Sequence, residues 1–124
     1  MNNAEVPLAK TLPFTAHTQT GAVLDFSFPL HKDTASPMRV SQLVNTLLGA
    51  LDRDVRTLGE TANGDILQAL AMALAVRTAM IPAPALTTTA MAHQLVDEAL
   101  GAVGSVVRSG PDAGPDSGPD SGTA

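Results

Sequence analysis

The sequence predicts a mainly helical α+β fold: an N-terminal β-hairpin packed on an up-down-up three-helix bundle, followed by a disordered C-terminal tail. Three observations lead to this fold class. Apolar and polar side chains alternate within residues 10–31, apolar side chains recur at helical spacing within residues 36–108, and Gly, Pro, Asp and Ser dominate residues 109–124. A period of two residues is typical of a strand, and a period of 3.6 residues is typical of an amphipathic helix.

Length and charge limit the kind of protein this chain is. Its 124 residues predict a single domain over residues 10–108, preceded by a flexible arm of residues 1–9. The formal net charge of -5 argues against a nucleic-acid partner and against attraction to an anionic membrane. The absence of cysteine excludes a disulfide, a thiolate zinc site and a cysteine nucleophile.

The hairpin is predicted from its turn and its register. Residues 19–21 fit a three-residue loop, with Gly21 at the position that requires a positive φ. Pairing Thr18 with Ala22 then places one set of apolar side chains on a single face: Leu12, Phe14, Ala16, Leu24, Phe26, Phe28 and Leu30. Since proline lacks a ladder donor, we expect the two prolines at outward-facing or terminal positions: Pro13 and Pro29.

The first helix is predicted to begin at Ser36 and Pro37, an N-cap followed by a proline in the first turn, and to end near Gly59. Apolar residues recur along it at steps of three and four, which is the spacing of an amphipathic helix. This apolar stripe consists of Val40, Leu43, Val44, Leu47, Leu48, Leu51, Val55 and Leu58.

The second helix, Ile66–Ile81, is apolar almost all the way round, although alanine makes up much of one side, and this pattern predicts a central position. Asp65 is placed as its cap or first-turn acid, and Pro82 ends it. The third helix is predicted to open near residues 87–89, where any of three threonines fits the cap, and to run to residue 108. Two glycines inside it indicate fraying, a bend or a close backbone approach: Gly101 and Gly104.

The last segment repeats a Gly-Pro-Asp unit at a period of four residues. The period excludes a collagen triple helix, which repeats every three residues. Because the segment has almost no apolar surface to bury, we expect residues 109–124 to be disordered.

His17 and Asp25 are the candidate chemical groups. In the predicted register they are diagonal neighbours on the polar face of the hairpin, within reach of a hydrogen bond, as in an acid–base pair or a partial metal site. We favour a solvated surface pair, since the hairpin forces no third group nearby. The sequence has no paired-histidine metal spacing, phosphate-binding loop or serine elbow, so we expect neither a metal nor a cofactor.

The apolar faces of the three helices and the hairpin exceed what one small domain hides. We therefore expect a partner, either a second copy in a two-fold homodimer or another protein. The candidate interface residues are Leu43, Leu47, Leu51, Leu70, Leu74, Leu95 and Val103.

These features predict a small non-catalytic protein that acts through protein–protein interaction, as an accessory or regulatory subunit, either as a helical homodimer or docked to a larger complex. The composition suggests a bacterial source, and the lack of a secretory signal suggests a cytoplasmic location. Two alternatives remain open. One is a small enzyme using His17 and Asp25, and the other is a carrier with an apolar cavity lined by Phe14, Phe26, Leu70 and Leu74.

Overall fold

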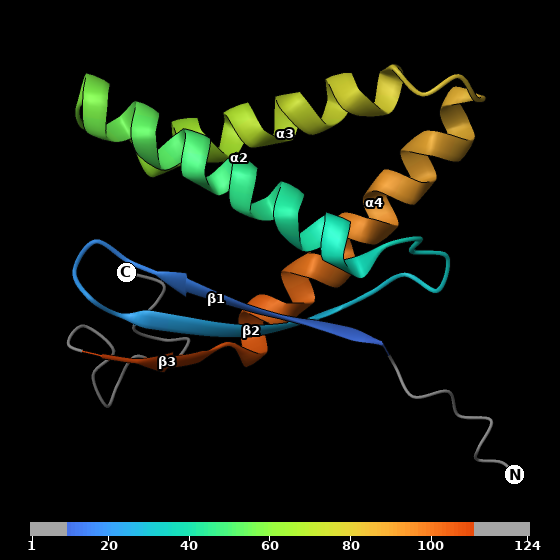
Figure 1. Ribbon diagram of the computed structural model, residues 1–124. Helices are drawn as coiled ribbons and strands as arrows, with labels where there is room; N and C mark the ends of the chain where they lie inside the picture. The colour runs from blue at the N-terminus through green and yellow to red at the C-terminus, as the bar shows by residue number, and fades with distance from the viewer. Residues whose placement is uncertain (1–9, 111–124) are drawn as a thin grey trace, which may run out of the picture. The chain divides into compact units, whose positions relative to one another are not determined.

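The structure of the chain is a computed structural model that describes residues 10–110, and it confirms the mainly helical α+β fold (Figure 1). The elements are β1 (Thr11–His17), β2 (Val23–Pro29), α2 (Pro37–Leu58), α3 (Asn63–Ala79), α4 (Ala85–Gly101), the 3-10 helix η1 (Ala102–Ser105) and β3 (Val107–Ser109). The predicted arm and most of the predicted tail, residues 1–9 and 111–124, lie outside the described residues. The up-down-up order of the helices and the packing of the hairpin on them stay predictions.

The chain divides into two compact units. The sheet unit contains residues 10–37 and 97–110 of the described chain, and the helical unit is Met38–Val96. The sheet unit therefore draws its strands from both sides of the helical unit in sequence. The helical unit contains nearly all of α2, all of α3 and the first two-thirds of α4.

The hairpin has the predicted turn and register. Phe14 pairs with Phe26 across β1 and β2, and the Thr18 N–H donates to the Ala22 carbonyl at 2.9 Å. Gly21 has a φ of 101°, the positive value that the three-residue loop requires. The predicted apolar face is the less exposed face along both strands, and Phe14 is only 9% exposed. The alternation of the sequence therefore fixes which side of the hairpin is covered.

Both hairpin prolines occupy positions where no ladder hydrogen bond is lost. The bonds from Thr18 to Ala22 and from Leu30 to Lys10 mark the even-numbered residues as the hydrogen-bonded pairs of β1 and β2. Pro13 and Pro29 are odd-numbered, so their nitrogens face away from the β1–β2 ladder, and both residues are exposed. This placement confirms the prediction for the prolines and removes a donor from each outer edge.

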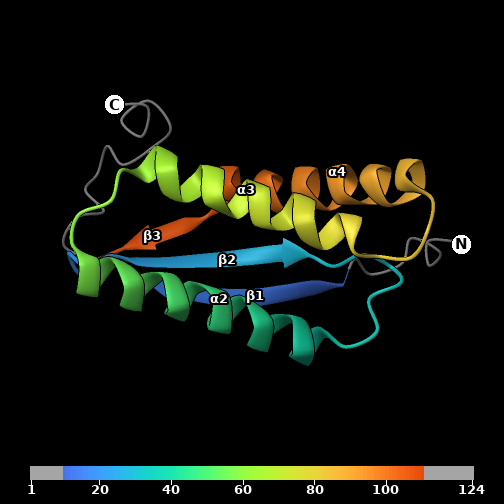
Figure 2. The same ribbon diagram turned by 90° about the horizontal axis from the view of Figure 1, so that it is seen from above.

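β3 was not predicted from the sequence, which indicated helix through residue 108. The α-helix ends at Gly101, a 3-10 turn follows, and Val107–Ser109 then pairs antiparallel with β2, so that the sheet order is β1-β2-β3 (Figure 2). Of the three explanations left open for the glycines, early fraying agrees with the end of α4 at Gly101, whereas a Cβ atom on Gly101 or Gly104 would meet nothing within 4 Å, which excludes a close approach. Ala102, at 4% exposed, lies in η1, which packs against β2. The β-branched pair Val106 and Val107, between Gly104 and Gly110, favours extended backbone over helix.

α2 and α3 begin and end close to the predicted residues, whereas α4 ends seven residues early. α2 ends as expected before Gly59, whose φ is 102° and whose N–H donates to the Val55 carbonyl at 2.8 Å, a left-handed helix stop. α3 starts three residues earlier than predicted, at Asn63, and Asp65 is an acid in its first turn. The predicted threonine cap of α4 is wrong, because α4 begins at Ala85, directly after Pro84.

Candidate functional site: an apolar groove between α3 and α4

The helical unit contains a groove between α3 and α4 with a volume of about 490 Å³. The two helices are joined by a short connection in which Pro82 and Pro84 prevent the helix from continuing. The Ala83 N–H donates to the Ile81 carbonyl at 2.8 Å, and the Thr87 N–H donates to the Pro84 carbonyl at 3.0 Å. These bonds close the end of α3 and open α4, which brings one face of each helix to the same groove.

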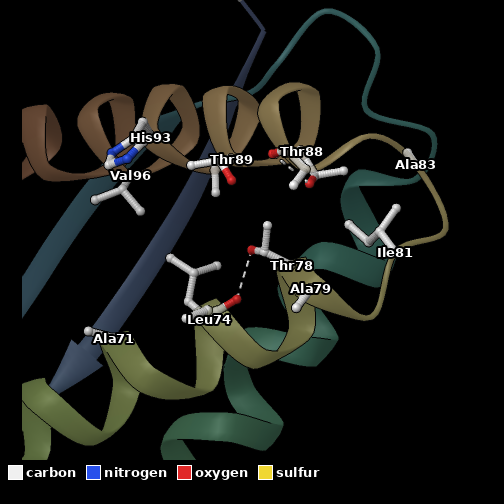
Figure 3. Close-up of a pocket in the computed structure, with 13 residues that line it drawn as sticks. Ala71, Leu74, Thr78, Ala79, Ile81, Ala83, Thr88, Thr89, His93 and Val96 are labelled. Atoms are coloured by element: carbon white, nitrogen blue, oxygen red, sulfur yellow. Dashed lines mark hydrogen bonds between the residues drawn. The ribbon is translucent and has the colours of Figure 1, made fainter.

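The groove is lined mainly by small or methyl-bearing side chains. On α3 and α4 its residues recur at steps of three and four, as expected for one face of each helix. Figure 3 shows Leu74 and Thr78 of α3 on one side and Thr88, Thr89 and Val96 of α4 on the other. The full lining is Ala71, Leu74, Ala75, Thr78, Ala79, Ile81, Ala83, Ala85, Thr88, Thr89, Ala92, His93 and Val96.

Two threonines of the lining direct their hydroxyl groups to the backbone. The Thr78 hydroxyl donates to the Leu74 carbonyl at 2.8 Å, and the Thr88 hydroxyl donates to the Ala85 carbonyl at 3.3 Å (Figure 3). A threonine that bonds a carbonyl of its own helix has satisfied its donor locally. The lining also contains no Asp, Glu, Lys or Arg. The groove is therefore suited to an apolar occupant.

The predicted interface residues fall into three places. Leu43 and Leu47 of α2 are exposed by 45% and 56%, and Leu51 on the same helix is half-buried. Leu74 lines the groove, while its α3 neighbour Leu70 is half-buried outside the lining. The remaining two are exposed in α4 and η1: Leu95 and Val103.

The structure gives His17 and Asp25 the diagonal relation that the register predicts, because Asp25 pairs with Thr15 and His17 pairs with Val23. The Thr15 hydroxyl donates to the Asp25 carboxylate at 2.7 Å. The carboxylate is thus engaged by a cross-strand threonine on the exposed face of the hairpin, and His17 is exposed beside it. This arrangement matches the surface reading more closely than an acid–base pair.

The apolar cavity differs from the one expected for a carrier. Of the four residues predicted to line it, Leu74 alone belongs to the groove, whose other walls come from α3, α4 and the connection between them. The residues that the prediction missed are the alanines spaced four apart on α3: Ala71, Ala75 and Ala79. Their signal was the alanine-rich side of the second helix. Alanine carries too little apolar area to stand out as a binding residue.

Within residues 10–110, no group of three or more His, Asp or Glu side chains is arranged to hold a metal ion. Nor does any helix in that range have the length and apolar character needed to cross a bilayer.

No family model, no curated protein and no solved structure matches the chain.

Proposed function

We propose that the chain is a small non-catalytic interaction protein, an accessory or regulatory subunit that works by packing its helices against protein helices. The partner is a second copy or a component of a larger complex. A cytoplasmic location in a bacterial cell belongs to the same proposal, supported by the cysteine-free sequence and its composition.

The observation that carries this proposal is the exposure of large apolar side chains along all three helices. None of α2, α3 and α4 contains a buried residue. Every one of them exposes leucines or methionines, and Leu86 of α4 is 88% exposed. Most helical stability in proteins comes from packing an apolar face rather than from the intrinsic helix propensity of the residues. Helices with such faces are stabilised when another protein surface covers them.

The leucine stripe of α2 is the best place to test the proposal. Size-exclusion chromatography of tagged protein from its source cells is expected to show a particle larger than one chain. Replacing Leu43 and Leu47 together by Glu places charges on the apolar face, so the particle is expected to shift to the size of a single chain. Asn45→Glu is the matched control, because Asn45 is exposed on the same helix off the stripe.

Amide signals of Phe14 and Phe26 report in each variant whether the sheet unit still folds, which separates loss of assembly from general unfolding. The proposal is wrong if the unchanged protein has the size of one chain both in the cell extract and after purification. It is also wrong if the Leu43→Glu/Leu47→Glu variant assembles as well as the Asn45→Glu control.

A further inference from the structure

The groove between α3 and α4 is wide because its walls are small. Three alanines form a straight row on α3 at steps of four residues: Ala71, Ala75 and Ala79. Ala85 and Ala92 contribute equally small side chains from α4. A groove of about 490 Å³ with such walls is filled by an occupant that brings bulky apolar side chains.

α2 carries a ridge that matches this row. Leu43, Leu47 and Leu51 are also spaced four apart, so the ridge and the alanine row each extend about 12 Å along their helices. Ridges of residues four apart pack into the corresponding grooves of another helix in the commonest class of helix contact. Bulky residues on one side and alanines on the other permit a close approach of the two backbones.

The leucine ridge does not fill the groove of its own chain. No residue of α2 is among those that line it, and Leu43 and Leu47 are both exposed. Ridge and groove are therefore both uncovered on one molecule. When two complementary surfaces occur on the same chain, a two-fold pairing of identical copies satisfies both at once.

Exposed apolar surface is plentiful on the helical unit as a whole, of which the ridge and the groove are a part. The exposed leucine, isoleucine, valine and methionine side chains of the helical unit present on the order of 1,000 Å² of apolar surface. A standard protein interface takes about 800 Å² from each partner. Neither the groove lining nor the leucine ridge contains Asp, Glu, Lys or Arg, so bringing them together desolvates no such charge.

We propose that the chain forms a two-fold homodimer in which α2 of each copy occupies the α3–α4 groove of the other. This inference rests on the proposed function and specifies its partner as a second copy. The central contact is Leu47 of one copy against Ala75 of the other, which lie at the middle of the ridge and of the alanine row. The pairing is reciprocal, so each dimer contains this contact twice.

The absence of native cysteine allows a direct test by disulfide trapping. Two full-length variants, Leu47→Cys and Ala75→Cys, are mixed and mildly oxidised. A disulfide forms when the two Cα atoms lie about 5–6 Å apart. We expect the mixed disulfide to form at least about tenfold faster than in control mixtures, because docking raises the effective concentration of the two thiols.

The controls change one position at a time. Asn45→Cys replaces Leu47→Cys with a position off the ridge of α2, and Ala73→Cys replaces Ala75→Cys with an alanine that does not line the groove. Light scattering of the unmodified chain and of each variant measures the mass before oxidation. Retained two-chain mass in the variants shows that the substitutions have not prevented assembly.

The proposal is supported by a two-chain mass together with preferential trapping of the mixed disulfide. Three results overturn it. The first is a one-chain mass at high concentration. The second is a disulfide within single molecules carrying both Leu47→Cys and Ala75→Cys, since α2 then closes on its own groove. The third is mixed trapping no faster than in the controls, as when two copies of α2 meet each other or when a small apolar ligand fills the groove.

The two proposals fail in distinguishable ways. If the purified chain is a monomer but the cell extract contains a larger particle that depends on Leu43 and Leu47, then the homodimer is wrong and the interaction role stands. If neither preparation exceeds one chain, then both proposals are wrong.

Discussion

Gly110 makes the closest backbone approach among the described glycines. Its φ is 101°, and a Cβ atom built on it would lie 2.6 Å from the Gly21 carbonyl oxygen and 3.0 Å from the Ala22 Cα atom. Gly110 follows β3, whereas Gly21 and Ala22 belong to the hairpin turn. Ala22 is only 2% exposed, so the end of β3 covers the turn closely. Two separate constraints therefore require glycine here, a positive φ and the lack of space for a side chain.

Gly110→Ala is expected to destabilise the protein more than Gly59→Ala. Gly59 has nearly the same φ, 102°, but a Cβ atom there meets nothing within 4 Å. Left-handed strain of about 1–2 kcal/mol applies to both variants, whereas the clash with the hairpin turn applies only to Gly110. Urea denaturation of the two variants measures the difference. Equal losses of unfolding free energy would show that the turn can move away from the added methyl group.

The two glycines of this contact differ in how far the sequence predicts them. Gly21 was predicted to have a positive φ, because the flanking alternation fixes the length of the loop. Gly110 begins the Gly-Pro-Asp repeat, which the sequence pattern assigns to the tail. Its role depends on a neighbour far away in the sequence, and local patterns carry no information about such contacts.

At the scale of elements, the pairing of β3 with β2 assigns each residue of β3 a different part in the ladder. The odd-numbered residues of β2 face β3, because the even-numbered ones bond with β1. Val107 pairs with Asp25 and therefore exchanges backbone hydrogen bonds with it. Arg108 pairs with Leu24 at a position where its N–H faces the outer edge. Neighbouring residues of β3 thus differ in whether their backbone N–H donates to β2.

Val107→Pro is expected to weaken the β2–β3 pairing by about 1–3 kcal/mol, because it removes an N–H that donates to β2. Arg108→Pro is expected to cost less, because the Arg108 N–H faces the outer edge of the sheet. Pro13 and Pro29 likewise stand at positions where no ladder donor is required. Hydrogen exchange at the Val23 and Asp25 amides measures the pairing. Faster exchange in Arg108→Pro than in Val107→Pro would mean that the register of β3 is wrong.

The elements were predictable to the extent that they are local. The register of the hairpin follows from alternation and one loop, and α2 follows from its stripe and its terminal proline and glycine. β3 has three residues, too few for alternation to show, and Val103, Val106 and Val107 continue the three- and four-residue spacing of α4. The signal against helix was the pair of glycines, Gly101 and Gly104, followed by the β-branched Val106 and Val107.

The groove was missed for a related reason. Sequence patterns rank positions by apolar size, and that ranking selected the leucines of each helix. The lining consists instead of alanines and threonines, which become prominent only when two helices bring their small faces together. Leu74 is both a predicted residue and part of the lining, because it is large and lies on the facing side of α3.

At the scale of the whole molecule, the helices have no buried residue, whereas the sheet unit contains Phe14, Ala22 and Ala102 as its core. Stability within one chain is therefore unevenly distributed. The sheet unit has its own covered apolar face, including Phe26 stacked on Phe28 with ring centroids 5.0 Å apart. The helical unit, Met38–Val96, has no buried residue of its own.

Helix content and melting temperature are therefore expected to rise with protein concentration. Assembly that stabilises folded helices but not unfolded ones adds a free energy that grows with the concentration of the partner. Circular dichroism across a dilution series measures both quantities. If melting temperature and helix signal stay constant on dilution, then the helices gain no stability from a second copy and the homodimer is wrong.

The antiparallel sheet joins strands from opposite ends of the described chain, and this has a consequence for biosynthesis. Ribosomes release a chain from its N-terminus, so β1 and β2 emerge first while β3 emerges after every helix. Until then Val23 and Asp25 present unsatisfied amide groups along one margin of the nascent hairpin. Nascent chains on the same messenger RNA can pair with each other through this uncovered edge of β2. Chaperone protection would therefore matter most between the synthesis of β2 and that of β3.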